Sequence, residues 1–453
     1  MKKFDIHKPT SLASRRKPPV SIPSSMSADD EGTKKWGLNI YLLFAVSWFL
    51  HLGARLPFLG VIRFDLLLVC VLMYLAFMSK KATDAHDEVP NSEGAKTDTI
   101  LRVLVAYSIL TIPFVYWPGS VINTGIANFV KAIVFYYFTV AFVRTERDVK
   151  KLIVVFVSCQ LVRIIEPLYL HITEGYWGDV AYMLAGTEAL DRLSGAPSDV
   201  INPNGLAFII CLVLPFLYLM AGLSWKSRIV AILLASTCLY TLALTGSRSG
   251  IVGLFVILLG ILAKAKRRVM WVTSVVIIGI VSFPMLSANM QDRYLSVIGL
   301  GEKNAGTAEG RVSGVIDNFM VVLHRPVFGH GLGTSREANA NFGGTDQPAH
   351  NLYVEVAQEL GLVGLTIFVV LLKSVYTGFN GCKKAYSQLD VSIFLRNLVD
   401  CMQIILFMNF IFSFASYGLS SYEWYFLGGM SVTMQRLATE TQGKTAVGLG
   451  AKT

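Results

Sequence analysis

The sequence predicts an all-α, polytopic integral membrane protein with about twelve transmembrane helices. Hydrophobic residues make up 53% of its 453 positions and charged residues only 15%, whereas a globular protein carries about 25% charged residues. Uncharged stretches long enough to cross a bilayer, which takes roughly 20 residues, recur along almost the whole chain. This composition argues against a soluble enzyme and against a nucleic-acid-binding protein, so the lipid bilayer is the first expected partner.

Six uncharged stretches are long enough to be unambiguous. They are 36–54, 103–130, 205–224, 229–247, 269–290 and 401–422. Shorter apolar blocks can span once flanking residues are included, and they are 66–78, 132–143, 152–170, 251–263, 360–372 and 424–434. The run 103–130 is expected to break into two helices at Trp117, Pro118 and Gly119, because proline and glycine interrupt helices.

The distribution of Lys and Arg predicts the orientation of the chain. If a twelve-span chain starts in the cytoplasm, its inner segments hold 29 of the 40 basic residues and its outer loops hold 9, with Lys131 and Arg163 left inside spans. Cytoplasmic loops of membrane proteins are enriched in Lys and Arg. Both termini are therefore predicted to be cytoplasmic, and most of the net charge of +10 reflects topology.

This orientation divides the chain into parts. Residues 1–35 are basic and rich in Ser and Pro, and they are predicted to form a disordered cytoplasmic tail. The transmembrane domain covers 36–436, and residues 437–453 form a second cytoplasmic tail. Two long loops, 173–203 and 287–352, are predicted to lie on the outer side, where the chemistry is expected.

No metal and no other cofactor is expected. The six cysteines form no CxxC pair, and five of them lie inside apolar stretches, so neither a disulfide framework nor a zinc site is predicted. His324, His330 and His350 share the loop 287–352, but their spacing matches no zinc signature.

Arg248 lies in the short outer segment 246–250 (GSRSG), at the start of an apolar helix. Both the positive-inside rule and the positive end of the helix dipole disfavour a cation there. Snorkelling of the side chain to lipid headgroups is one explanation. The other is that Arg248 and neighbouring backbone N–H groups bind an anion such as a phosphate at the helix N-terminus, with the glycines letting the ligand approach.

The loop 287–352 contains a helix-period pattern that begins at Arg311. Its apolar face consists of Val312, Val315, Ile316, Phe319 and Leu323. This pattern predicts an amphipathic helix that lies along the outer leaflet. His350 follows a turn rich in glycine and comes directly before the next membrane helix. It is either a hydrogen-bonded interface histidine or a general base for an incoming hydroxyl group.

The other long loop contributes Arg192, its only basic residue, and the turn 202–205 (NPNG). A surface ion pair would explain Arg192 as well as a role in anion binding does. Asn204 in this turn, and Asn351 beside His350, are further candidate contacts for a substrate.

Two charged features lie inside predicted spans. Arg163 and Glu166 are three residues apart on one helix, so they are expected to neutralise each other and to play a structural role. Lys131 has no evident partner in the sequence, and it is a further candidate for contact with the bound anion.

Several of these segments together resemble the motifs of a known family. They are 192–195 (RLSG) with 202–204 (NPN), 246–250 (GSRSG), Arg311, 326–329 (PVFG) with Gly331 and Gly333, and 350–353 (HNLY) with Gly361 and Gly364. Their order and separations resemble the O-antigen ligase and O-antigen polymerase (Wzy-type) superfamily of polytopic bacterial membrane proteins. The resemblance covers about 190–370. His330 departs from the family pattern, which has an apolar residue there, and it is given no role.

The resemblance implies a metal-independent, inverting glycosyltransferase of the bacterial inner (plasma) membrane that acts at the periplasmic face. Such enzymes take part in the biosynthesis of cell-envelope polysaccharides, for example those of lipopolysaccharide. The donor would be a glycan linked to undecaprenyl diphosphate, and the acceptor a saccharide or a lipid-core sugar. Arg248 and Arg311, together with Arg192, would then hold the diphosphate leaving group, and His350 would activate the acceptor hydroxyl group.

The sequence leaves two questions open. A ligase moves a finished glycan onto a lipid A core sugar, whereas a polymerase joins repeat units on the same carrier. The sequence does not distinguish them, because the two share the donor and the chemistry and differ only in the acceptor. The alternative to an enzyme is a polytopic membrane transporter of an anion or a glycan. The gathering of the notable charges on one outer face and the lack of inverted repeats disfavour a transporter. A non-catalytic scaffold subunit would not explain why Arg248 lies at the outer end of an apolar helix.

Overall fold

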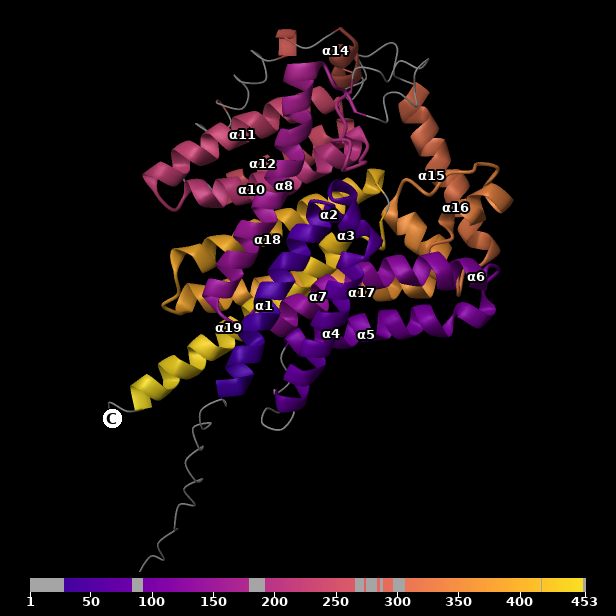
Figure 1. Ribbon diagram of the computed structural model, residues 1–453. Helices are drawn as coiled ribbons and strands as arrows, with labels where there is room; N and C mark the ends of the chain where they lie inside the picture. The colour runs from indigo at the N-terminus through magenta and orange to yellow at the C-terminus, as the bar shows by residue number, and fades with distance from the viewer. Residues whose placement is uncertain are drawn as a thin grey trace, which may run out of the picture.

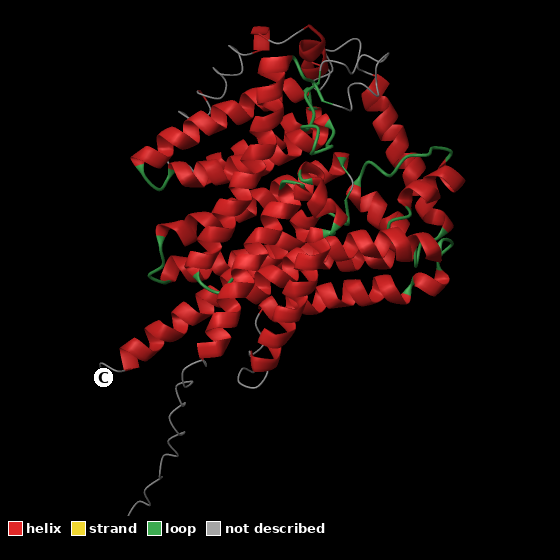
Figure 2. Ribbon diagram, in the orientation of Figure 1, coloured by secondary structure: helices red, strands yellow, loops and turns green. Residues whose placement is uncertain are grey.

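The computed structural model describes residues 28–83, 93–178, 192–264, 273, 283–285, 288–295, 306–416 and 418–450. Within these ranges every regular element is a helix (Figures 1 and 2). Six helices of the described part are long and apolar enough to cross a membrane: Pro118–Phe142, Glu146–Glu174, Pro203–Ala221, Trp225–Thr245, Leu352–Gln388 and Ile393–Ala415. The all-α membrane class is therefore confirmed. The count of about twelve spans and the orientation stay predictions, and the predicted span 269–290 and tail 1–35 lie largely outside the described residues.

The first part of the chain forms a series of helices of very different lengths. In order they are α1 (Ala28–Phe49), α2 (Leu52–Arg55), α3 (Pro57–Val61), α4 (Phe64–Thr83), α5 (Glu93–Leu110), η1 (Ile112–Phe114), α6 (Pro118–Ser120), η2 (Val121–Gly125), α7 (Ile126–Phe142) and α8 (Glu146–Glu174). The break between α5 and α7 falls where proline and glycine interrupt the apolar run, as the sequence predicts.

The second part contains the predicted motifs. Its helices are α10 (Pro203–Ala221), α11 (Trp225–Thr245), α12 (Arg248–Lys264), η3 (Phe283–Met285), α14 (Ala288–Leu295), α15 (Gly306–His324), α16 (Ser335–Ala338), η5 (Asn339–Gly343), α17 (Leu352–Gln388), α18 (Ile393–Phe412), η6 (Ser413–Ala415) and α19 (Tyr422–Gly450). The helix predicted after Arg311 is present as the C-terminal part of α15. Among its predicted apolar residues, Ile316, Phe319 and Leu323 are exposed, as a face against lipid would be.

The long helices form one bundle in which α19 packs against α7 and α17, and α18 packs against α10, α12 and α17. In Figure 1 the group α10, α11 and α12 lies at the upper left, α15 and α16 lie at the right, and the C-terminal end of α19 is at the lower left. We call the side of the bundle on which α10, α12 and α17 begin and α18 ends the motif face. It carries the predicted segments 192–205, 246–250 and 350–353.

An aromatic cluster joins four helices beneath the motif face. Phe49 of α1 lies 5.7 Å from Phe135 of α7 and 5.2 Å from Phe156 of α8, measured between ring centroids. Tyr422 of α19 lies 5.0 Å from both Phe49 and Phe135. Phe426, one turn further along α19, stacks on Phe156 at 5.0 Å. Such contacts bury large rings and fix the neighbouring helix ends relative to one another.

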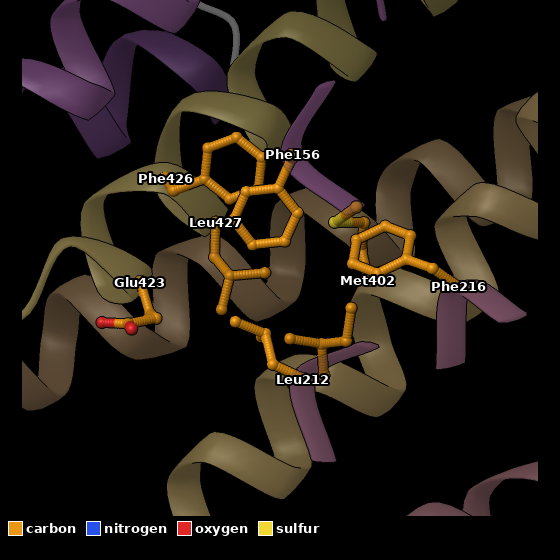
Figure 3. Close-up of a pocket in the computed structure, with 8 residues that line it drawn as sticks. Phe156, Leu212, Phe216, Met402, Glu423, Phe426 and Leu427 are labelled. Atoms are coloured by element: carbon orange, nitrogen blue, oxygen red, sulfur yellow. The ribbon is translucent and has the colours of Figure 1, made fainter. Parts of the chain in front are cut away.

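The cavity in Figure 3 lies inside this bundle, between α8, α10, α18 and α19. Its walls are mainly apolar, with Phe156, Phe216 and Phe426 among them, and the Glu423 carboxylate points away from these rings. Its volume is about 10 Å³, room for roughly one water molecule. A diphosphate or a sugar ring does not fit in this cavity.

A break in α17 fixes its first turns on the motif face. Gly361 has φ 68°, and a Cβ at this position would collide with the carbonyl group of Val327. The chain after α15 docks at the break, because the N–H of Leu362 donates to the carbonyl of Pro326 at 2.7 Å, and the N–H of His330 donates to that of Gln358 at 2.7 Å. Only glycine combines this left-handed φ with so close an approach.

The predicted neutralisation of Arg163 by Glu166 is wrong. Arg163 instead forms two hydrogen bonds with Asp199, which lies before α10, and Glu166 pairs with Arg55 of α2. Residues three apart on a helix can pair, but an isolated pair of this kind contributes only about 0.2–0.5 kcal/mol. Partners from other segments satisfy both charges with better geometry, and they tie α8 to its neighbours.

Candidate functional site

Hydrogen bonds around the Asn204 side chain join the segments that carry Arg192 and Arg248. Arg192 Nη2 donates to Asn204 Oδ1 at 2.9 Å, and Ser247 Oγ donates to the same oxygen at 2.9 Å. Arg192 Nε also donates to the carbonyl oxygen of Thr245 at 2.8 Å. The structure therefore brings three predicted site segments together, although they are far apart in the sequence. We call Arg192, Asn204, Ser247 and Arg248 the arginine cluster.

Two helix N-termini meet in the arginine cluster. Asn202 caps α10, since its Oδ1 accepts from the N–H of Gly205 at 2.8 Å, and Ser247 Oγ accepts from the N–H of Gly250 at 3.1 Å at the start of α12. The N-terminus of a helix carries a partial positive charge of about +0.5 and unpaired N–H groups. Two such ends beside two arginines form a place suited to an anion with several oxygens.

The hydrogen bonds of Arg192 fix the direction of its guanidinium group. Two of its hydrogen bonds go to neutral oxygens, one from a side-chain amide and one from the C-terminal end of α11. These bonds orient the side chain toward the same pair of helix ends. Arg248 is partly buried as the first residue of α12.

The glycines of segment 246–250 have a packing explanation that differs from the expected one. Gly246 ends α11 with φ 56°, a left-handed cap that glycine adopts without strain. A Cβ at Gly250 would lie 2.8 Å from Leu242 Cδ1 and 2.9 Å from Ala207 Cβ. The space beside Gly250 is thus filled by α10 and α11 and is not open to a ligand.

His350 is exposed and lies directly before the cap of α17. Asn351 is that cap, because its Oδ1 accepts from the N–H groups of Tyr353 at 3.0 Å and Val354 at 3.2 Å. Asn351, predicted as a substrate contact, therefore has a structural role in holding the helix start. His350 is the exposed side chain of this pair.

The C-terminal end of α18 connects His350 with the arginine cluster. Asn351 Nδ2 donates to the carbonyl of Phe414 at 3.3 Å, next to His350. Two residues before Phe414, the ring of Phe412 packs against that of Phe208 of α10 at 5.0 Å. A Cβ at Gly253 of α12 would lie 3.3 Å from the same Phe412 ring. The starts of α10, α12 and α17 therefore surround one helix end, and His350 lies on the same face as Arg248.

Two other predicted site residues are not joined to the arginine cluster by any contact described for them. Arg311 lies in α15, whose described C-terminal half packs against α17, and the Arg311 side chain lies outside the described residues. Lys131 is exposed on α7, and its Nζ lies 3.5 Å from Asn128 Oδ1 on the same helix. Their contribution to anion binding stays a prediction.

His330, which sequence reasoning gave no role, belongs to the packing beneath the motif face. Its side chain is fully buried, its Nε2 lies 3.1 Å from the carbonyl oxygen of Val321, and its ring stacks against that of Tyr116. Burial lowers the pKa of His330, which favours the neutral ring in this apolar setting. Within the described residues, His, Cys, Asp and Glu side chains form no group of three or more suited to a metal ion.

Sequence reasoning missed two residues of this region. Ser247 lies between Gly246 and Arg248, and a serine before an apolar helix is a typical cap that the pattern could have identified. Asp199 was one acidic residue among several in its loop, and its partner Arg163 is 36 positions away. No local pattern could have paired these two residues.

Comparison with known proteins supports the family resemblance of the second part of the chain. Residues 230–369 match the family model described as O-antigen ligase. The matched segment contains Arg248, Arg311 and His350, whereas Arg192 and Asn204 lie before it. No curated protein gives a significant match to the chain.

Proposed function

Since residues 230–369 match the O-antigen ligase family model, we propose that this multi-pass membrane protein transfers a glycan from a lipid-linked diphosphate to an acceptor sugar at the motif face. The observation that carries the proposal is the arginine cluster, in which Arg192 and Arg248 lie at the adjoining N-termini of α10 and α12. Such a place suits a group that becomes more negative as the reaction proceeds. In this proposal the motif face is the periplasmic face.

The chemistry needs one leaving group and one activated nucleophile. The acceptor hydroxyl oxygen attacks the anomeric carbon of the donor, and the bond from that carbon to the diphosphate oxygen breaks. Its electron pair stays on the diphosphate, where arginine side chains and helix N-termini stabilise the added charge. The hydroxyl proton moves to the imidazole of His350. A single displacement of this kind inverts the anomeric configuration.

The geometry supports a separation of roles between the two parts of the site. Arg192 and Arg248 lie on segments held by α10, α11 and α12, while His350 lies at the start of α17. This placement assigns the diphosphate to the arginine cluster and the acceptor hydroxyl group to His350. We further propose undecaprenyl diphosphate as the carrier, and either a lipid-core sugar (ligase) or a second carrier-linked unit (polymerase) as the acceptor.

Purified protein in lipid nanodiscs tests the proposal. Incubated with an undecaprenyl-diphosphate-linked oligosaccharide and candidate acceptors, it should release free undecaprenyl diphosphate in proportion to a new glycosidic bond of inverted configuration, and EDTA should leave the rate unchanged. The acceptor that is elongated identifies a ligase or a polymerase. Donor that stays intact with every acceptor, combined with glycan flux in sealed vesicles, would instead identify a transporter.

A further inference from the structure

Asp199 is a buried carboxylate that connects three parts of the chain. Its side chain is 1% exposed, and it accepts hydrogen bonds from Arg163 Nε at 2.5 Å and from Arg163 Nη2 at 3.0 Å. His51, in the connection before α2, brings its Nδ1 to 3.5 Å from Asp199 Oδ1. Asp199 itself lies in the segment before α10. This carboxylate therefore ties that segment to α8 and to the end of α1.

Arg163 is held in turn by a second layer of polar groups. It is 7% exposed, and its Nη1 donates to Gln160 Oε1 at 3.0 Å. Gln160, which is fully buried, donates from Nε2 to the hydroxyl group of Tyr422 at 3.0 Å. The guanidinium is thus fixed from two sides. A buried charged pair costs several kcal/mol of desolvation for each ion, and hydrophobic residues of similar volume stabilise a fold at least as well. Stability alone is a weak reason for this pair.

The turn around Asp199 carries the neighbouring cluster residues in a fixed register. The N–H of Asp199 donates to the carbonyl of Ala196 at 2.9 Å, the N–H of Ile201 donates to that of Asp199 at 2.8 Å, and the N–H of Gly195 donates to that of Ile201 at 3.0 Å. A Cβ at Gly195 would collide with the carbonyl oxygen of Asp199. The turn is therefore a compact unit that cannot shift without moving both of its ends.

Two residues of the arginine cluster lie on either side of this turn in the sequence. Arg192 lies before the turn, and Asn204 lies after it in the first turn of α10. Their hydrogen bond at 2.9 Å closes the segment on itself, and Asn204 also holds Ser247 beside Arg248. Arg192 and Asn204 thus bind each other across segment 192–205, and the Arg163–Asp199 pair anchors the middle of that segment. The pair therefore sets where the Arg192 guanidinium points.

We propose that Arg163 and Asp199 are positioning residues that hold Arg192 and Asn204 in place for the donor diphosphate. The inference rests on the proposed function of the arginine cluster. Neither residue needs to touch substrate; both act through the segment 192–205. A displaced Arg192 weakens binding of the donor, while the acceptor and His350, at the start of α17, are unaffected.

Kinetics with separate donor and acceptor titrations test this inference in nanodiscs. Asp199→Asn keeps the shape of the side chain but loses the charge that pairs with Arg163. Its kcat/KM for the donor should fall about tenfold, through a higher donor KM and a lower kcat, because a displaced Arg192 loses contact with the diphosphate both before and during bond cleavage. The acceptor KM should stay within about twofold of wild type. Arg163→Lys keeps the charge but not the two-point contact, and it should give an intermediate donor KM.

Glu166→Gln is the matched control. Glu166 lies one turn after Arg163 on α8 and also pairs with an arginine, since Arg55 Nη1 donates to its Oε1 at 2.8 Å, but this pair reaches α2 and not the segment 192–205. We expect the control to lower the melting temperature without raising the donor KM. A general loss of packing would change both variants alike.

Each outcome separates the inference from the proposed function. An Asp199→Asn variant with the wild-type donor KM, or equal kinetic changes in Asp199→Asn and Glu166→Gln, overturns the positioning role if Arg248→Lys is still impaired. If Arg248→Lys and His350→Ala also transfer glycan at the wild-type rate, the proposed function itself fails. If Asp199→Asn does not fold, Arg163→Lys decides, because an unchanged donor KM in that variant contradicts the inference.

Discussion

Replacing His350 with alanine should abolish glycan transfer while the protein stays folded. A positioned general base contributes about 10²–10⁴-fold to a rate, and His350 is an exposed side chain that lies just outside the cap of α17. Its removal therefore takes away the proton acceptor without a large loss of packing. The measurement is the rate of undecaprenyl diphosphate release at saturating donor and acceptor, together with the melting temperature.

The matched control for this variant is His324→Ala. His324 is exposed at the end of α15, and its ring stacks on that of Phe342 at 4.9 Å, but it has no part in the proposed chemistry. It should keep the wild-type rate. Added imidazole should restore part of the activity of His350→Ala, since it supplies a base to the vacated space. Full activity of His350→Ala without imidazole would remove His350 from the mechanism.

Replacing Arg248 with lysine should lower the rate about tenfold to a hundredfold, less than the roughly 10²–10³-fold cost of removing a hydrogen-bond donor to a developing charge altogether. Lysine keeps the positive charge, but it replaces a planar fork that can hold two phosphate oxygens by a point charge. Arg248 begins α12 next to Ser247, and the hydrogen bond from Ser247 to Asn204 holds the backbone there. The backbone therefore cannot move to bring the shorter lysine side chain to the phosphate. Single-turnover kinetics with the lipid-linked donor measure the effect.

Arg336→Lys provides the comparison for Arg248→Lys. Arg336 forms a two-point pair with Asp346 at 2.8 Å on an exposed surface, and such pairs contribute little. This variant should be indistinguishable from wild type in rate. If Arg248→Lys also turns over at the wild-type rate, the side chain interacts with lipid headgroups and does not hold the leaving group.

The class of protein could be predicted, and the segments of the candidate site could be proposed, because their signals are local. Apolar runs, the break near Trp117 and the position of Arg248 beside a helix start are all visible within a few residues. The motif order predicted the O-antigen ligase resemblance, which is confirmed for residues 230–369. The capping role of Asn351 was equally local, since asparagine is favoured directly before a helix, but its place beside His350 favoured the substrate role.

The pairing of charges could not be predicted, because it depends on how helices are rotated and which loops fold back on them. Glu166 was the nearest acid to Arg163 in the sequence, yet Asp199 and Arg55 provide the actual partners. The meeting of Arg192, Asn204 and Ser247 likewise depends on the packing of α10 against α11 and α12. Sequence spacing carries no information about such contacts, although it identified two of these three residues as candidates.

In the proposed function, a lipid diphosphate binds where α10 and α12 begin. A donor analogue with a photoreactive group next to its diphosphate tests this directly, with the crosslinked peptides identified by mass spectrometry. We expect crosslinks in segments 192–205 and 246–250, and about tenfold weaker labelling of Arg248→Lys, the loss of one charge-assisted contact. Labelling that falls mainly on other segments, or that is equally strong in Arg248→Lys, would contradict the account.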